Sequence, residues 1–197
     1  MRSIIIILMS MLLISCDINM KFDQEDKVWL NTYKEGDLLI FGSEARKDSI
    51  LIKNIEISNT DRDVLASSYN PIGGIVNYKD LYSNEINYIY AVSKYEPNTP
   101  TEVMFHFKGD KGRITDIHNY PISIINIKGR VHKGYLFKPY SKEKQFVYWD
   151  LEYGLKNPTL EYFFWDKEFG IIEYKTMEGE VFILEKFIRD GENILEL

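Results

Sequence analysis

The residues best suited to chemistry lie in two copies of an aromatic and acidic pattern. Residues 148–155 read Tyr-Trp-Asp-Leu-Glu-Tyr-Gly-Leu, and residues 164–171 read Phe-Trp-Asp-Lys-Glu-Phe-Gly-Ile. Each copy predicts an aromatic strand that ends in an acidic turn, with the glycine entering positive φ before the next strand. The pattern supplies six candidate ligand-binding residues, namely Trp149, Asp150, Glu152, Trp165, Asp166 and Glu168.

Three interpretations of this pattern compete. Indole rings and carboxylates together bind sugars, because rings stack on apolar sugar faces and carboxylates accept hydrogen bonds from hydroxyls. Glycoside hydrolysis would need two carboxylates about 5 to 9.5 Å apart, a distance that spacing in sequence does not set. The structural alternative puts both tryptophans in the core and the acids at solvated corners. Aromatic side chains bury large areas, so we prefer the structural role over binding, and binding over hydrolysis.

Nucleophilic catalysis has few residues to draw on. The single cysteine, Cys16, is the expected site of lipidation, so its thiol is not counted as a nucleophile. A Ser-His-Asp site would have to use His106, His118 or His132, and no Gly-x-Ser-x-Gly motif accompanies them. The lack of a free cysteine and of a nucleophile motif favours a protein that is not an enzyme.

Metal and phosphate sites are also weakly supported. The three histidines lack the His-Glu-x-x-His spacing of zinc enzymes. Residues 59–70 begin like a calcium loop, but Val64 stands where the loop needs Gly and Asn70 where it needs Glu. Glycine-rich phosphate loops are missing from the sequence. We therefore expect no metal and no cofactor.

Composition and turn signals predict the elements that position these residues. Tyrosine, phenylalanine and isoleucine are plentiful and only three alanines occur, which favours strands over a helical bundle. Short apolar or alternating runs separated by Gly-rich turns predict a mainly β fold. We expect a single antiparallel sandwich or barrel of about ten short strands, with at most one or two short helices.

Several local features follow from the same patterns. A break in alternation near Lys53 predicts a β-bulge within residues 49–57. Residues 102–108 alternate as a half-buried strand, and residues 109–112 predict the hairpin turn into a strand over residues 113–118. Residues 122–128 read as a buried strand. A helical turn or two is expected at residues 61–69, inside a long irregular connection over residues 59–85 that is more often a surface excursion than a binding loop.

The N-terminus carries an export signal. Arg2 precedes an apolar run over residues 4–14, which is shorter than the roughly 20 residues of a membrane-spanning helix. The sequence Leu13-Ile14-Ser15-Cys16 then resembles the lipobox of bacterial lipoproteins. The resemblance implies cleavage before Cys16 and lipidation of its thiol with acyl chains such as palmitate. Two or more acyl chains hold a protein stably on a membrane.

This interpretation divides the chain into three parts. Residues 1–15 are a cleaved signal peptide, residues 16–27 are the lipidated Cys16 and a polar tether, and residues 28–197 are a single β-rich domain. The mature chain would have 182 residues, which is within the size of one domain. Its opening, with Tyr33 three residues before Gly36-Asp37, loosely resembles uncharacterised Gram-negative envelope lipoproteins and brings no functional residues with it.

Location and partners follow from the anchor and the charge. We expect a protein of the bacterial cell envelope, attached to a membrane through its N-terminal lipid. Asp17 resembles the inner-membrane retention signal of enterobacterial lipoproteins, a rule not shared by all bacteria, and we favour the outer membrane. The chain has 24 basic and 30 acidic residues. Dispersed acidic charge argues against nucleic acid as a partner and leaves an envelope protein or a glycan.

Three functions remain open at this point. The preferred one is a lipid-anchored, non-catalytic binding or accessory domain. The second is a carrier of a lipid or another apolar ligand in a barrel or half-barrel, which would need a continuous apolar cavity. The third is a glycan-binding or glycan-cleaving envelope protein.

The anchor is directly testable. Cys16→Ala removes the thiol that would carry the diacyl group, so the variant should lose acylation and leave the membrane fraction. Mass spectrometry of the N-terminal peptide and fractionation of cells would measure both effects. Retention of an unacylated variant on membranes would refute the anchor.

Overall fold

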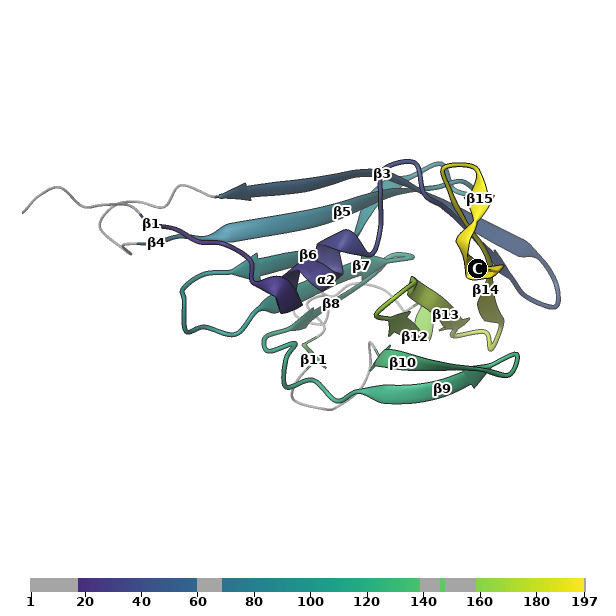
Figure 1. Cartoon of the computed structure of the whole chain (residues 1–197). Coiled ribbons are helices and arrows are strands. Elements are labelled where there is room, and N and C mark those ends of the chain that lie inside the picture. Colours follow the sequence, from purple (N-terminus) through teal and green to yellow (C-terminus); the bar gives the residue numbers. More distant parts are fainter. Residues whose placement is uncertain (1–17, 60–68, 139–145, 148–158, 197) are drawn as a thin grey trace, which may run out of the picture.

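The computed structural model describes residues 18–59, 69–138, 146–147 and 159–196 (Figure 1). Within them nearly every strand joins one antiparallel sheet of 13 strands, so the prediction of a mainly β, antiparallel fold is confirmed. The sheet curls into a half-barrel. Figure 1 shows its two walls as β3 and β5 above and β9 and β10 below.

Two meanders meet at the centre of the sheet. The first runs outward from β2 through consecutive neighbours: β2 (Leu38–Gly42), β3 (Lys47–Asn59), β5 (Ile72–Asp80), β6 (Ile86–Lys94), β7 (Glu102–Phe107), β8 (Asp110–Ile114) and β11 (Phe146–Val147). The second runs outward from β14: β14 (Val181–Arg189), β13 (Gly170–Thr176), β12 (Leu160–Asp166), β10 (Arg130–Phe137) and β9 (Ser123–Ile127). Pairing of β2 with β14 joins them, with Leu38 opposite Ile188.

Three smaller elements complete the described chain. The short strands β1 (Ile18–Asn19) and β4 (Tyr69–Asn70) pair in parallel, apart from the main sheet. After β14 the chain folds back as β15 (Glu192–Asn193) and ends in the 3₁₀ helix η2 (Ile194–Glu196). In the described part of the chain no helix has the length and apolar character needed to cross a membrane.

The helix α2 (Gln24–Asn31) lies on the concave side of the half-barrel (Figure 1). Its Trp29 stacks on Trp165 of β12, with ring centroids 3.8 Å apart and planes inclined by 19°. Trp29 also packs edge-on against Tyr90 of β6 and stacks on Tyr135 of β10. One indole therefore joins both walls of the half-barrel, and the apolar interior is continuous from one wall to the other.

Close backbone packing explains two glycines near this contact. A Cβ at Gly134 would lie 1.9 Å from the carbonyl oxygen of Trp165, so β10 and β12 can approach only with glycine there. Gly170 has φ of +72°, as predicted for the glycine that ends the second aromatic and acidic pattern. A Cβ at Gly170 would also meet the Tyr33 hydroxyl at 1.9 Å, where that hydroxyl accepts a hydrogen bond from the Ile171 N–H.

Two local predictions are confirmed. The register between β3 and β5 shifts between Ile52 and Asn54, which is the bulge expected near Lys53. On β7, Val103, Phe105 and Phe107 all point into the core. Period-2 alternation is therefore a dependable guide where one face of a strand is buried.

The hairpin after β7 differs from the prediction. The turn lies at Lys108 and Gly109, both with positive φ, and β8 already begins at Asp110. Two consecutive left-handed residues give the type I′ turn that matches strand twist. The following strand is also shorter than predicted and ends at Ile114, because Asp116 accepts the Asn119 N–H and turns the chain.

The strand predicted as buried over residues 122–128 is instead the edge strand β9. More buried and more exposed side chains alternate along β9. Ile124 is 68% exposed, and Ile122, which precedes the strand, is 48% exposed. An isoleucine-rich sequence can form either a central strand or an exposed edge strand. The periodicity of the sequence does not show whether a neighbouring strand is present on each side.

The prediction of a polar tether over residues 16–27 is wrong for residues 18–27, which the structure describes. Asp23 caps α2 and forms a reciprocal capping box with Asp26, and the Asp26 side chain is fully buried. Met20 and Phe22, which precede the helix, join the core. Acidic residues near the start of the chain are therefore a helix N-terminus and not a solvated spacer.

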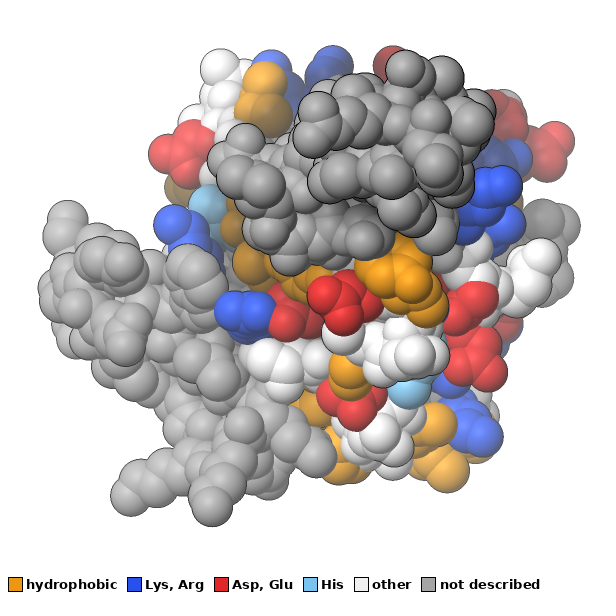
Figure 2. Space-filling model, turned by 90° about the vertical axis from the view of Figure 1, so that its left-hand side faces the viewer, with side chains coloured by type: hydrophobic (Ala, Val, Ile, Leu, Met, Phe, Trp, Pro, Cys, Tyr) orange, Lys and Arg blue, Asp and Glu red, His pale blue; other side chains and the backbone are white. Residues whose placement is uncertain are grey.

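Figure 2 views the molecule from the left-hand side of Figure 1. Asp and Glu side chains, Lys and Arg side chains and hydrophobic side chains are interspersed on the part of this face that is coloured by type. No large single-sign area appears among the residues coloured by type in this view.

The packing of Trp165 gives a stability prediction. Trp165→Ala removes a fully buried indole and its stack on Trp29, and should lower the free energy of unfolding by about 3 to 5 kcal/mol. Urea denaturation would measure the change. Tyr82→Ala is the matched control, since this aromatic ring is 80% exposed and its removal should change stability by less than about 0.5 kcal/mol.

Candidate functional site

The second copy of the aromatic and acidic pattern forms a corner of the sheet. Trp165 is fully buried, so its ring faces are covered by protein and are not presented to a ligand. Glu168 is exposed and lies 3.7 Å from Arg130. The first copy, with Trp149, Asp150 and Glu152, lies outside the described residues.

Asp166 serves the turn that follows β12. Its Oδ1 accepts the N–H groups of Glu168 and Phe169, and its Oδ2 lies 3.1 Å from Nδ1 of His132. Both Asp166 and His132 are buried. In the structure, therefore, Trp165 packs in the core, Asp166 stabilises the turn after β12, and Glu168 forms an ion pair at the surface.

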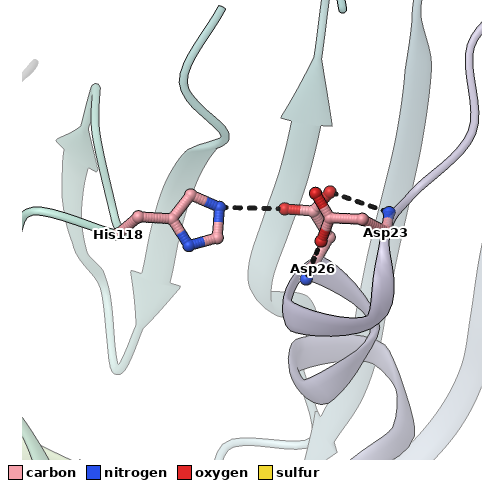
Figure 3. A group of neighbouring side chains, drawn as sticks. All are labelled: Asp23, Asp26 and His118. Carbon is pink, nitrogen blue, oxygen red and sulfur yellow. Dashed lines mark hydrogen bonds and ion pairs between the residues drawn. The ribbon is translucent and has the colours of Figure 1, made fainter.

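A second group of polar residues fixes the start of α2. Asp23, Asp26 and His118 approach one another closely enough to suggest a metal site (Figure 3). Nε2 of His118 is 3.2 Å from Oδ1 of Asp26, which also accepts a hydrogen bond from the Thr101 hydroxyl. Oδ2 of Asp26 accepts the Asp23 N–H.

The charge of this group is balanced from within the protein. Nζ of Lys94 lies 2.8 Å from Oδ2 of Asp23 and 3.1 Å from Oδ2 of Asp26. A bound cation would have to displace this ammonium group and the three other contacts to the Asp26 carboxylate, from Thr101, His118 and the Asp23 N–H. The hydrogen bond from Lys94 lowers the pKa of Asp23 to about 2, which keeps that carboxylate ionised. The group fastens α2 to β6 and to the segment after β8.

The best candidate site is a pocket at one mouth of the half-barrel. Its cavity volume is about 300 Å³. The turns between β2 and β3, β5 and β6, β7 and β8, and β13 and β14 all contribute to this end of the sheet. We call it the mouth pocket, and the side chains that matter for its chemistry are Arg46, Asp48, Asp80, Tyr82, Lys108 and Thr176.

An ionic bridge forms the floor of the mouth pocket. Nζ of Lys108 is 2.6 Å from Oδ2 of Asp48 and 2.5 Å from Oδ2 of Asp80. All three side chains are largely buried. The bridge joins the turn between β7 and β8 to β3 and β5. Burying it is tolerable because each charge is paired and hydrogen-bonded. Asp80 also accepts the N–H groups of Tyr82 and Ser83.

The protonation states of the floor are set by these contacts. Burial opposes ionisation of Asp80, but its hydrogen bonds from Lys108 and the backbone outweigh burial and lower its pKa. Burial and the neighbouring Asp48 raise the pKa of Tyr174, whose hydroxyl donates to Asp48. At neutral pH the floor therefore presents a carboxylate at Asp80 and a neutral hydroxyl at Tyr174.

The rim adds an aromatic ring and a hydroxyl. Tyr82 projects into solvent with the Arg46 guanidinium 5.9 Å from its ring centroid, and Glu180 holds Arg46 in place. The Thr176 hydroxyl is buried and has no hydrogen-bond partner among the described residues. An exposed ring, an unpaired hydroxyl and paired charges are groups that recognise a small polar molecule.

Sequence reasoning missed the residues of the mouth pocket. They come from four separate turns and from strands at opposite ends of the chain, so no local spacing connects them. One signal was available in the sequence, because Gly109 marks a turn and so places Lys108 and Asp110 at an end of the sheet. Comparisons with known proteins add no further guide, because no protein-family model, no curated protein and no solved structure matches the chain.

The lowered pKa values of Asp23 and Asp80 predict that the folded protein loses stability in acid. The lowered pKa of Asp23 gives stability that is present above the ordinary value of 3.8 and lost as pH falls toward about 2. The lowered pKa of Asp80 acts in the same direction. The free energy of unfolding should therefore decrease as the pH is lowered through this window. Asp23→Asn keeps a good helix cap but cannot titrate, so the slope of stability against pH should be smaller. Urea denaturation between pH 2 and 5 would measure it, and an unchanged slope would contradict the assignment.

Proposed function

We propose that this chain is a lipid-anchored protein of the bacterial envelope whose β-domain binds a small polyhydroxylated ligand, such as a saccharide, without catalysing its conversion. The observation that carries the proposal is the mouth pocket, where a solvent-facing ring, an unpaired hydroxyl and an ionic floor converge. Anchoring rests on the lipobox at residues 13–16.

The chemistry of the pocket favours a neutral polar ligand. Lys108 is already shared by Asp48 and Asp80. Arg46 is paired with Glu180, and Lys47 with Glu185. Among the described residues that line the pocket, each cation therefore already has a carboxylate partner. Sugars combine apolar ring faces with many hydroxyls. Tyr82 supplies a flat surface for the first feature, and Thr176 and the carboxylates supply partners for the second.

The same groups support binding over hydrolysis. Glycoside hydrolysis needs one carboxyl group that holds a proton at working pH. On the floor of the mouth pocket Lys108 contacts the carboxylates of both Asp48 and Asp80, and the pKa of Asp80 is lowered and not raised. A hydrolase would place its acid where burial raises the pKa without a neighbouring ammonium group.

The packing of the half-barrel speaks against an apolar carrier. The concave side is filled by α2, and the rings of Trp29, Phe105, Phe137 and Phe163 make direct contacts across it. A carrier would need a continuous apolar cavity between these walls. In the described residues that space is occupied by side chains.

The proposal predicts saccharide binding that depends on Tyr82. Calorimetric titration of the full chain with a panel of hexoses, N-acetylhexosamines and their disaccharides should identify at least one ligand. Tyr82→Ala removes the stacking surface and should weaken that affinity roughly three- to tenfold. NMR amide shifts should appear at Tyr82, Lys108 and Thr176.

Two matched variants sharpen the test. Tyr82→Phe keeps the ring and loses only the phenol hydroxyl, so affinity should stay within about twofold of the wild type. Thr176→Val removes the unpaired hydroxyl at nearly constant shape and should weaken binding. If no member of the panel binds, or if binding is indifferent to Tyr82, the mouth pocket is not a saccharide site.

A further inference from the structure

The hairpin of β9 and β10 differs in charge from the rest of the chain. Residues 117–138 contain four cationic residues and no Asp or Glu, whereas the whole chain has a formal net charge of -6. Arg130 is near Glu168, but Lys128 and Lys133 are exposed and form no ion pair with a carboxylate of the described residues. A local basic surface therefore exists on an acidic protein, which the expectation of dispersed charge did not anticipate.

β9 is the last strand on this side of the sheet. In the described chain β10 is its only partner, so the other side of β9 has no neighbouring strand. Lys128 and Gly129 form a two-residue turn with φ of 50° and 85°. In such a hairpin the residues flanking the turn, Ile127 and Arg130, share both hydrogen bonds, and the bonded pairs then alternate.

This alternation decides which backbone groups are free. Ile125 and Ser123 bond to β10, so the N–H and C=O groups of Ile124 and Asn126 point away from the sheet. They form the repeating donor and acceptor pattern that a further strand requires. The edge is long enough for two such residues and carries no proline within β9.

Exposed apolar side chains lie beside this edge. Ile122, Ile124 and Val131 are 48%, 68% and 66% exposed. Val131 and Lys133 share a face of β10 with Tyr135 and Phe137, which point into the core, and Ile124 is opposite Lys133. The apolar side chains and a free cation therefore lie together on the concave side, next to the open edge.

We propose that β9 docks an extended peptide segment as an added strand, and that this segment alternates apolar and acidic side chains. Its backbone pairs with Ile124 and Asn126, its apolar side chains cover Ile122 and Ile124, and its carboxylates lie within reach of Lys128 and Lys133. Main-chain hydrogen bonds give affinity in this mode of recognition, and the side chains give specificity.

Two other occupants fit the surface less well. A second copy of the chain would bring two hairpins of like charge together, and like charges disfavour that pairing. An anionic membrane would match the lysines, but hydrocarbon offers no partners for the outward N–H and C=O groups, which are costly to leave unsatisfied. A strand with alternating apolar and acidic side chains would make the main-chain hydrogen bonds, cover the exposed apolar side chains and pair with the lysines.

The test uses a synthetic eight-residue peptide of alternating valine and glutamate. Fluorescence anisotropy would measure its affinity for the full chain, held in zwitterionic nanodiscs if the chain is acylated. Ile124→Pro removes one outward N–H at an edge position that tolerates proline, and should weaken binding roughly tenfold. Lys133→Glu should weaken it by a similar factor.

The matched control is Lys53→Glu, which makes the same charge change at an exposed position on β3 and should leave affinity within about twofold. A peptide of alternating valine and lysine should bind at least tenfold more weakly than the acidic peptide. Thermal unfolding of each variant would confirm that it folds. Lys133→Glu keeps the test decisive if Ile124→Pro does not fold.

Three results would overturn the proposal. The first is equal affinity for the acidic and basic peptides, or affinity unaffected by both hairpin variants. The second is protection of the β9 amides from hydrogen exchange by phosphatidylglycerol nanodiscs but not by the peptide, which would make the surface a lipid contact. The third is a dimer in sedimentation velocity that Ile124→Pro dissociates. None of these involves a residue of the mouth pocket, so the saccharide proposal stands or fails separately.

Discussion

The contact between Trp29 and Trp165 is the interaction on which the rest of the structure depends. A half-barrel leaves its concave face open, and α2 is the element that covers this face in the described chain. Trp29 can reach Trp165 only if the helix is held at one position and angle. The capping box, the Lys94 ion pairs and the contacts of Asp26 with Thr101 and His118 supply that constraint. Polar contacts at the helix start therefore determine the packing of the apolar interior.

The half-barrel divides its chemistry between the interior and the rim. In the part of the chain that the structure describes, aromatic side chains fill the inside, and polar groups gather where the turns meet. The bridge through Lys108 connects the turn between β7 and β8 to β3 and β5 at the floor of the mouth pocket. The open edge at β9 is a separate surface. Under the two proposals, one scaffold would offer two kinds of recognition at places that do not overlap.

The sequence predicted the features that depend on local pattern. Alternation identified the core face of β7, a broken alternation located the bulge at Ile52, and the glycine of the repeat has the expected positive φ at Gly170. Features that depend on distant neighbours were out of reach. Asp26 reads as a tether residue until Lys94 and Thr101 are known to surround it. The mouth pocket likewise combines residues from Arg46 to Thr176, which only the fold brings together.

The pairing of β2 with β14 has a consequence for the order of folding. Leu38 lies opposite Ile188, and Trp29 meets Trp165, so the contacts that close the core join the two ends of the chain. Closing such a long loop must precede the gain from packing, and topologies with many non-local contacts fold slowly. A chain emerging N-terminus first would expose α2 and the first meander without their partners until the last strand arrives. The core can then be completed only after β12 and β14 have been synthesised.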